Sequence, residues 1–205
     1  MQKIMFNDRY GLTDLVLSGK KTQTRRIVPK EVFTLDWDTR QSSEGGTLEL
    51  VIADSFGSYH NVIDTIYNKY KNNEVVAVAQ SYYSAKVVGD TTVDYPLIFD
   101  DGDAGYYNKM FVKAKLMPHA IKITNIRVER LQDISDEDCL AEGIEKMIVG
   151  CEYYCYSFLS PNPNKIWEDF KSPRQAYATL IDKVNGKGTW ASNPYVFVYD
   201  FELVK

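Results

Sequence analysis

The sequence predicts an α+β fold in which helices are inserted among the strands of a small β-barrel. Strand-like segments of uneven length are interrupted by helical segments that do not alternate regularly with them. Residues 195–203 alternate over one long strand, which places Phe197 and Phe201 on one face, toward the barrel interior. The 205 residues are 44% hydrophobic and 25% charged, an ordinary globular composition. We therefore interpret residues 1–205 as a single domain.

The N-terminal segment contains a short strand, a helix and a second strand. Residues 3–7 are predicted as the first strand. Apolar residues at helical spacing predict a helix over residues 9–20, and Gly19 is suited to end it. Two threonines and a closing Ile-Val pair predict a strand over residues 21–28, which Pro29 ends.

The middle of the chain is predicted to hold two loops, a helix and a buried strand. Residues 34–47 are polar and contain glycine, and residues 84–108 are acidic and contain glycine, so both are predicted as loops. Residues 75–79 form a short apolar run typical of a buried strand. A helix over residues 59–70 is predicted from an apolar repeat of three and four, carried by Tyr59, Val62, Ile63, Ile66, Tyr67 and Tyr70.

The second half of the chain carries the clearest local signals. Strands are predicted over residues 109–134, and the alternation shifts by one residue near Thr124, as a β-bulge would cause. A short acidic helix begins after Ser135 and ends at Gly143. Residues 172–186 begin with serine, proline and, three after the serine, glutamine, and this pattern predicts a capped helix.

The distribution of charge favours a local anionic ligand over a long duplex. The net charge is −4, which argues against a protein coated in positive charge for non-specific DNA binding. Residues 19–30, however, contain no acid and carry five basic residues, namely Lys20, Lys21, Arg25, Arg26 and Lys30.

The sequence also bears on location, metals and cofactors. No apolar run reaches the roughly 18 residues of a membrane helix, and the first eight residues do not resemble a signal peptide, so we expect a cytoplasmic protein without a membrane partner. Three cysteines cannot all pair within the chain, which fits a reducing compartment. A zinc site usually needs two close ligand pairs, and only Cys151 and Cys155 form one. We therefore expect no metal and no cofactor.

Three blocks of sequence resemble a known family. Residues 19–26, Gly-Lys-Lys-Thr-Gln-Thr-Arg-Arg, resemble the G-x-K-x-x-T-x-R signature of ASCH domains, which belong to the PUA-like β-barrel superfamily. Residues 126–144 and residues 186–197 are similar to the central and C-terminal blocks of phage and prophage ASCH proteins. Relative to that family, residues at about 31–70 and 145–170 resemble insertions.

The resemblance implies a barrel with a cleft for nucleic acid or nucleotides. A smaller related group, the bacterial 4-acetylcytidine amidohydrolases, uses a lysine and a threonine of the same signature together with a glutamate. Matched residue by residue, these fall on Lys21, Thr24 and Glu142. The phage family usually continues one apolar strand into Arg-Glu-Thr-aromatic, whereas residues 79–82 here are Ala-Gln-Ser-Tyr, so both charges are missing.

The first functional hypothesis is recognition of RNA or a nucleotide in a basic cleft lined by aromatic residues. Arginine and lysine suit phosphate, and exposed aromatic rings stack on bases. The residues expected to contact the ligand are Lys20, Lys21, Arg25, Arg26, Gln80, Tyr82 and Trp190.

The alternative hypothesis is an amidohydrolase acting on 4-acetylcytidine or a similar modified nucleoside. A threonine hydroxyl needs a base within hydrogen-bond reach to act as a nucleophile, and a lysine can be that base when its pKa is lowered. Residues three apart in a regular strand point to opposite faces, so Lys21 and Thr24 share a site only if the chain turns there. Glu142 would orient the lysine or carry a proton. A third hypothesis is a prophage accessory protein that binds another protein.

Overall fold

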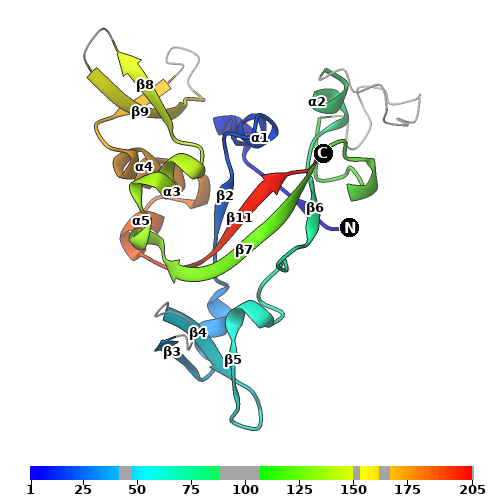
Figure 1. Cartoon of the computed structure of the whole chain (residues 1–205), viewed down its shortest axis with the longest axis vertical. Coiled ribbons are helices and arrows are strands. Elements are labelled where there is room, and N and C mark those ends of the chain that lie inside the picture. The colour runs from blue at the N-terminus through cyan, green and yellow to red at the C-terminus, as the bar shows by residue number, and fades with distance from the viewer. Residues whose placement is uncertain (42–47, 88–106, 150–152, 162–166, 205) are drawn as a thin grey trace.

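A five-stranded sheet forms the centre of the computed structural model, which describes residues 1–41, 48–87, 107–149, 153–161 and 167–204 (Figure 1). The strand order is β1-β6-β7-β11-β2, and only the β1–β6 pair is parallel. The long strands β7 and β11 pair along most of their length and cross the molecule side by side. The five strands are β1 (Lys3–Ile4), β2 (Gln23–Ile27), β6 (Val75–Val78), β7 (Ala120–Arg130) and β11 (Tyr195–Leu203).

Two three-stranded antiparallel sheets flank the central sheet. The strands of one lie within residues 31–70, and those of the other lie within residues 145–170. In Figure 1 the β3–β4–β5 sheet lies at the bottom of the molecule, and the β8–β9 hairpin lies at the upper left. Their strands are β3 (Trp37–Gln41), β4 (Leu48–Ala53), β5 (Tyr59–Asn61), β8 (Glu145–Val149), β9 (Tyr153–Leu159) and β10 (Trp167–Phe170).

Helices lie beside the sheets, so the expected α+β class is confirmed. The expected small β-barrel is not shown, because within the described residues the central sheet is open, with β1 and β2 as its edges. No helix of this part of the chain is long and apolar enough to cross a membrane. The α-helices are α1 (Leu12–Leu17), α2 (Tyr82–Val87), α3 (Asp136–Ala141), α4 (Pro173–Asn185) and α5 (Thr189–Ser192).

The predicted starts of two helices are confirmed, and the cap predicted at Ser172 is present. The Ser172 hydroxyl accepts a hydrogen bond from the backbone N–H of Gln175 at the start of α4, and Pro173 is the first helical residue. Ser135 caps α3 in the same way, by accepting from the N–H of Asp138. Helix α3 contacts both β2 and α4, so these three elements lie next to one another.

The predicted helix over residues 59–70 is wrong. This segment contains the end strand β5, a 3₁₀ turn over Val62–Asp64 and irregular structure, and the side chain of Ile66 is 92% exposed. The Asn61 side chain accepts from the N–H of Ile63 and starts the turn. A 3₁₀ turn places residues three apart on one side, so it produces the same apolar spacing as a helix over a short stretch.

Two other local predictions need correction. Part of the loop predicted over residues 34–47 is strand β3, while residues 42–47 lie outside the described residues. Residues 107–119 hold a 3₁₀ turn over Ala114–Leu116 and no strand. Most of the acidic loop predicted over residues 84–108 lies outside the described residues, and its first residues belong to α2.

The β-bulge is confirmed and bends the strand pair at the centre of the sheet. Asn125 of β7 pairs with Asp200 of β11, and Ile123 pairs with Phe201, so Thr124 is the extra residue. Phe197 and Phe201 are buried as expected, and so is Val198 between them, because both faces of β11 are covered.

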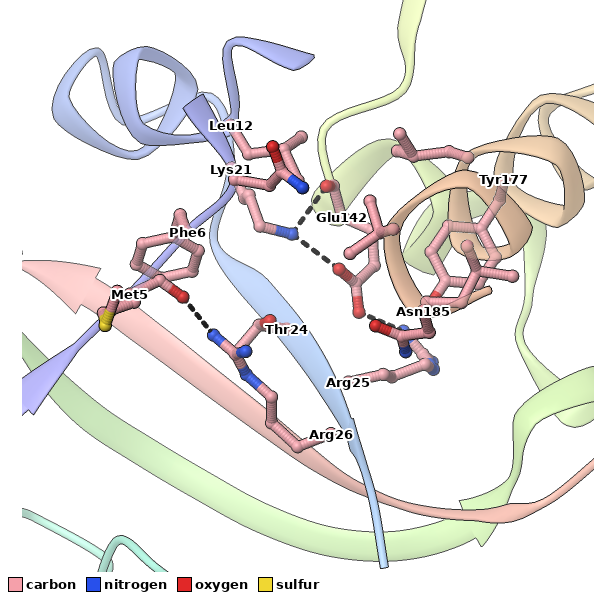
Figure 2. A pocket seen from close by; sticks show the side chains of 14 residues that line it. Met5, Phe6, Leu12, Lys21, Thr24, Arg25, Arg26, Glu142, Tyr177 and Asn185 are labelled. Carbon is pink, nitrogen blue, oxygen red and sulfur yellow. Dashed lines mark hydrogen bonds and ion pairs between the residues drawn. The ribbon is translucent and has the colours of Figure 1, made fainter. Parts of the chain in front are cut away.

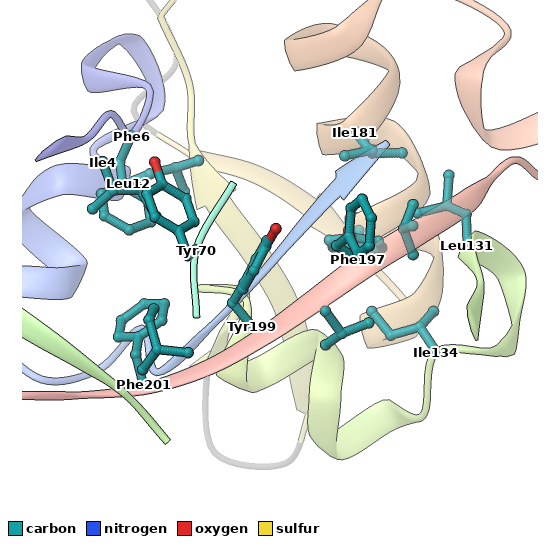
Figure 3. Packing of buried hydrophobic residues seen from close by; sticks show 14 of the residues in the cluster. Ile4, Phe6, Leu12, Tyr70, Leu131, Ile134, Ile181, Phe197, Tyr199 and Phe201 are labelled. Atoms are coloured by element: carbon teal, nitrogen blue, oxygen red, sulfur yellow. The ribbon is translucent and has the colours of Figure 1, made fainter. Parts of the chain in front are cut away.

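One buried apolar cluster joins the central sheet to the flanking elements. Figure 3 shows Phe197, Tyr199 and Phe201 of β11 packed among side chains from β1, α1 and α4. Leu50 of β4 and Phe158 of β9 belong to the same cluster, so the flanking sheets share the core of the central sheet.

Candidate functional site

A pocket of about 340 Å³ opens between the N-terminal segment, β2, the end of α3 and the face of α4 (Figure 2). Lys21, Thr24 and Glu142, the three residues matched to the amidohydrolases, all line it. The structure therefore brings together residues that are up to 121 positions apart in the sequence.

The chain turns before β2, which lets Lys21 and Thr24 share this pocket. The backbone N–H of Lys21 donates to Leu15 O, and that of Thr22 donates to Ala141 O, each at 2.9 Å. Strand β2 begins only at Gln23. Lys21 therefore precedes the regular strand, and the rule that residues three apart point to opposite faces does not apply to it.

Gly143 allows the end of α3 to approach this turn closely. Its φ angle of +105° lies in a region that residues with a side chain rarely adopt. A Cβ atom at this position would lie 3.1 Å from Leu15 Cδ1 and 3.6 Å from Lys21 Cδ. The glycine thus places Glu142 directly against Lys21.

Lys21 and Glu142 form a buried ion pair. Lys21 Nζ lies 2.5 Å from Glu142 Oε2 and 2.6 Å from the Glu142 carbonyl oxygen, and the lysine side chain is only 2% exposed. Burial lowers the pKa of Lys21 below its usual 10.5, although Glu142 opposes this shift. A lysine in this state loses its proton more readily than an exposed one, as a general base must.

Arg25 lies behind this pair at the centre of a cluster of opposite charges, the Arg25 cluster. Its guanidinium lies 2.7 Å from Glu129, 2.8 Å from Asp138 and 3.3 Å from Glu142. Arg127 joins the cluster through Glu129, Asp138 and Asp200. Gln23 donates to Asp138 and Asp200 and accepts from Arg25.

Because of the Arg25 cluster, the basic segment at residues 19–30 is not a patch of unpaired positive charge. That segment contains no acid, but the fold surrounds it with carboxylates from β7, α3 and the residue after α3. Two of its five cations, Lys21 and Arg25, are buried and paired with them. Glu129, Asp138 and Arg127 were not identified by sequence reasoning, since each is an ordinary surface-type residue in its own segment.

Thr24 and Arg26 present polar groups to the pocket without carboxylate partners. Within the described part of the chain, the Thr24 hydroxyl has no hydrogen-bond partner, although the residue is only 5% exposed. Arg26 donates to Met5 O at 2.5 Å, and its guanidinium lies 5.9 Å from the centre of the Phe6 ring. Among the residues that the structure describes, no carboxylate lies within ion-pair distance of the Arg26 guanidinium.

The other residues expected to contact a ligand do not line this pocket. Lys20 is exposed and pairs with Glu145 at 3.1 Å. Gln80 and Tyr82 are buried, and Tyr82 packs in a second apolar cluster with Met117. Trp190 packs at the edge of the main core, with its ring centre 6.2 Å from that of Tyr177.

Sequence reasoning missed the contribution of α4 to the pocket. Tyr177, Leu180, Ile181, Val184 and Asn185 line one wall, and their spacing resembles an ordinary core-facing stripe. Tyr177 brings a polar hydroxyl into this otherwise apolar stripe, and that hydroxyl was the signal in the sequence that could have identified it. Its hydroxyl is buried and has no hydrogen-bond partner among the described residues, and burial raises its pKa well above 10.

Within the described residues, no group of three or more histidine, cysteine or acidic side chains is arranged to hold a metal ion. Neither family models, nor curated proteins, nor solved structures give a match to this chain.

Proposed function

We propose that the protein hydrolyses a small amide, with an acylated nucleobase or nucleoside such as 4-acetylcytidine as the substrate class. The observation that carries this proposal is the meeting of Lys21, Glu142 and Thr24 in one pocket. The resemblance of residues 19–26 to ASCH domains and the related amidohydrolases supports the same assignment.

The size and lining of the pocket favour a small ligand. A volume of about 340 Å³ lies at the lower end of the roughly 300–1,000 Å³ typical of small-molecule sites. Apolar side chains from α4 and the N-terminal segment cover part of the wall and suit a planar heterocycle. The buried cations Lys21 and Arg25 are already paired, so a phosphate would have to compete with carboxylates for them.

The proposed acylation step uses Thr24 as the nucleophile. Neutral Lys21 takes the proton of the Thr24 hydroxyl while the oxygen attacks the amide carbonyl carbon. The carbon–nitrogen bond then breaks, and Lys21 returns the proton to the leaving amine. The acyl group remains as an ester on Thr24. Glu142 holds Lys21 Nζ, through its carboxylate and its carbonyl oxygen, in the pocket that Thr24 also lines.

The proposed deacylation step repeats the transfer with water. Lys21 takes a proton from a water molecule while the oxygen of that water attacks the ester carbon. The ester carbon–oxygen bond breaks, and Lys21 gives the proton to the Thr24 oxygen. One amide and one water are thereby converted into one amine and one carboxylic acid, and the enzyme returns to its starting state.

The decisive experiment follows the release of cytidine from 4-acetylcytidine by chromatography. We expect turnover by the wild type, residual turnover by Thr24→Ser and a loss of at least about 100-fold in Thr24→Ala and Lys21→Ala, the scale of nucleophile and base effects. Thr22→Ala is the matched control, because Thr22 is an exposed threonine of the same segment. Circular dichroism verifies that each variant is folded.

Full activity in Thr24→Ala would exclude the proposed nucleophile, and no turnover by the wild type would exclude this substrate. In the second case, recognition of RNA or a nucleotide becomes the favoured function, with Arg26 as its cation. That function predicts an affinity for short RNA that falls with salt and falls further in Arg26→Glu.

A further inference from the structure

The hydroxyl of Tyr177 is itself buried and has no hydrogen-bond partner among the described residues. Tyr199 donates to Asn68 Oδ1 at 2.6 Å, and Tyr70 donates to the carbonyl oxygen of Lys3 at 3.2 Å. Tyr177 is equally buried, at 2% exposed, and lines the pocket. A buried polar group without a partner costs stability, so it calls for an explanation.

The surroundings of Tyr177 define what it can bind. In Figure 2 its ring lies on the α4 side of the pocket, across from Lys21 and near Glu142, whose charge acts on it. The Arg25 guanidinium carbon lies 6.0 Å from its ring centre. Because burial raises its pKa, the phenol stays protonated over the working pH range and can donate a hydrogen bond.

The two buried cations of the pocket, Lys21 and Arg25, are already engaged. Lys21 Nζ donates to two oxygens of Glu142, and Arg25 donates to three carboxylates. A ligand acceptor that enters the pocket therefore meets the Tyr177 hydroxyl as a donor that is free among the described residues. A carbonyl oxygen is such an acceptor.

We infer that the Tyr177 hydroxyl donates a hydrogen bond to the carbonyl oxygen of the bound ligand and orients that carbonyl toward Thr24. This inference rests on the proposed function, since it takes the ligand to carry an amide. It assigns α4 a role in ligand specificity: a ligand with an acceptor at this point satisfies the hydroxyl, and an analogue without one leaves it unpaired.

The test measures the affinity for 4-acetylcytidine by calorimetry in a Thr24→Ala background, where turnover does not interfere. Adding Tyr177→Phe keeps the ring and removes the hydroxyl. We expect the Kd to rise at least about tenfold, as for the loss of one well-made hydrogen bond. We expect no decrease in Tm, because the hydroxyl has no partner to lose among the residues that the structure describes.

Tyr70→Phe in the same background is the matched control. Tyr70 is also buried, but its hydroxyl is paired and it does not line the pocket. We expect a lower Tm and an unchanged Kd for this variant. The two tyrosines should therefore give opposite patterns, which a purely structural role for Tyr177 would not produce.

The outcomes separate this inference from the proposed function. An unchanged Kd or a lower Tm in Tyr177→Phe overturns the inference, whether or not the wild type hydrolyses 4-acetylcytidine. Weaker binding by Tyr177→Phe without any turnover by the wild type supports the inference and excludes hydrolysis of this substrate. If 4-acetylcytidine does not bind at all, both proposals are overturned.

Discussion

The Arg25 cluster and the pocket beside it share strand β2, but their polar groups are satisfied to opposite degrees. In the cluster, each nitrogen of the Arg25 guanidinium donates to a described side chain. In the pocket, the hydroxyls of Thr24 and Tyr177 have no partner in the described part of the chain. The difference separates the buried polar groups that are paired within the fold from those that are left unpaired in it.

Glu142 belongs to both regions and connects them. One carboxylate oxygen lies 2.5 Å from Lys21 in the pocket, and the other lies 3.3 Å from Arg25 in the cluster. The cluster thus fixes the position of the glutamate, and the glutamate fixes the lysine. A change in the cluster should alter stability, whereas a change in the pocket should alter binding or turnover.

The largest expected effect is that of removing the cation at the centre of the cluster. Arg25→Leu leaves Glu129, Asp138 and Glu142 close together without their shared partner. Breaking a buried ion pair by removing one partner costs about 3–5 kcal/mol, a large share of the roughly 5–15 kcal/mol that stabilises a domain. We expect insoluble or largely unfolded protein, measured by chemical denaturation.

Lys20→Ala is the control for that variant. Lys20 comes from the same basic segment, but its ion pair with Glu145 is at the surface, where the lysine side chain is 59% exposed. Surface pairs contribute about 0–1 kcal/mol. Equal losses of stability in the two variants would contradict the view that the Arg25 cluster holds the fold.

Much of the fold could be predicted from local signals. The helix start at Ser135, the cap at Ser172, the alternation of β11 and the bulge at Thr124 each depend on a few residues, and each is confirmed. The prediction of a helix over residues 59–70 is wrong because apolar spacing does not distinguish a helix from successive turns that bury one residue each. Three-residue spacing is shared by both.

The candidate site could be predicted only in part. Lys21 and Thr24 lie within one short signature, and Glu142 was matched through a resemblance. The Arg25 cluster depends on contacts across more than 100 residues, such as the pair of Arg25 with Glu129. No local pattern in the sequence encodes such a pairing. Tyr177 was missed because an amphipathic helix usually buries its aromatic residues in a core.

A smaller effect is expected from Trp190→Ala. The indole is partly buried and packs against Tyr177 and below the guanidinium of Arg174, 5.1 Å away. Truncating a fully buried tryptophan to alanine costs about 3–5 kcal/mol, so truncating this partly buried one should cost about 2 kcal/mol. We expect a lower Tm with little change in the affinity for 4-acetylcytidine. A normal Tm with weakened binding would instead place Trp190 in the site, as the sequence predicted.

The smallest expected effect is a change in acid stability from Asp138→Asn. Burial alone would raise the pKa of Asp138, but hydrogen bonds from Gln23 and Arg25 and the charges of Arg25 and Arg127 lower it below the usual 3.8. A lowered pKa means that the native state binds fewer protons than the unfolded chain as the pH falls through about 4. The stabilisation by Asp138 is therefore present above that pH and is lost below it.

Asparagine at position 138 keeps one acceptor and has no charge to titrate. Because Asp138 is partly exposed, we expect the variant to be less stable than the wild type at pH 7 by only about 1 kcal/mol. This difference in the free energy of unfolding, measured by urea denaturation from pH 7 to pH 3, should shrink as the pH falls below about 4. A difference that stays constant over the whole range would show that the Asp138 charge does not contribute to the cluster, and that its hydrogen bonds alone matter there.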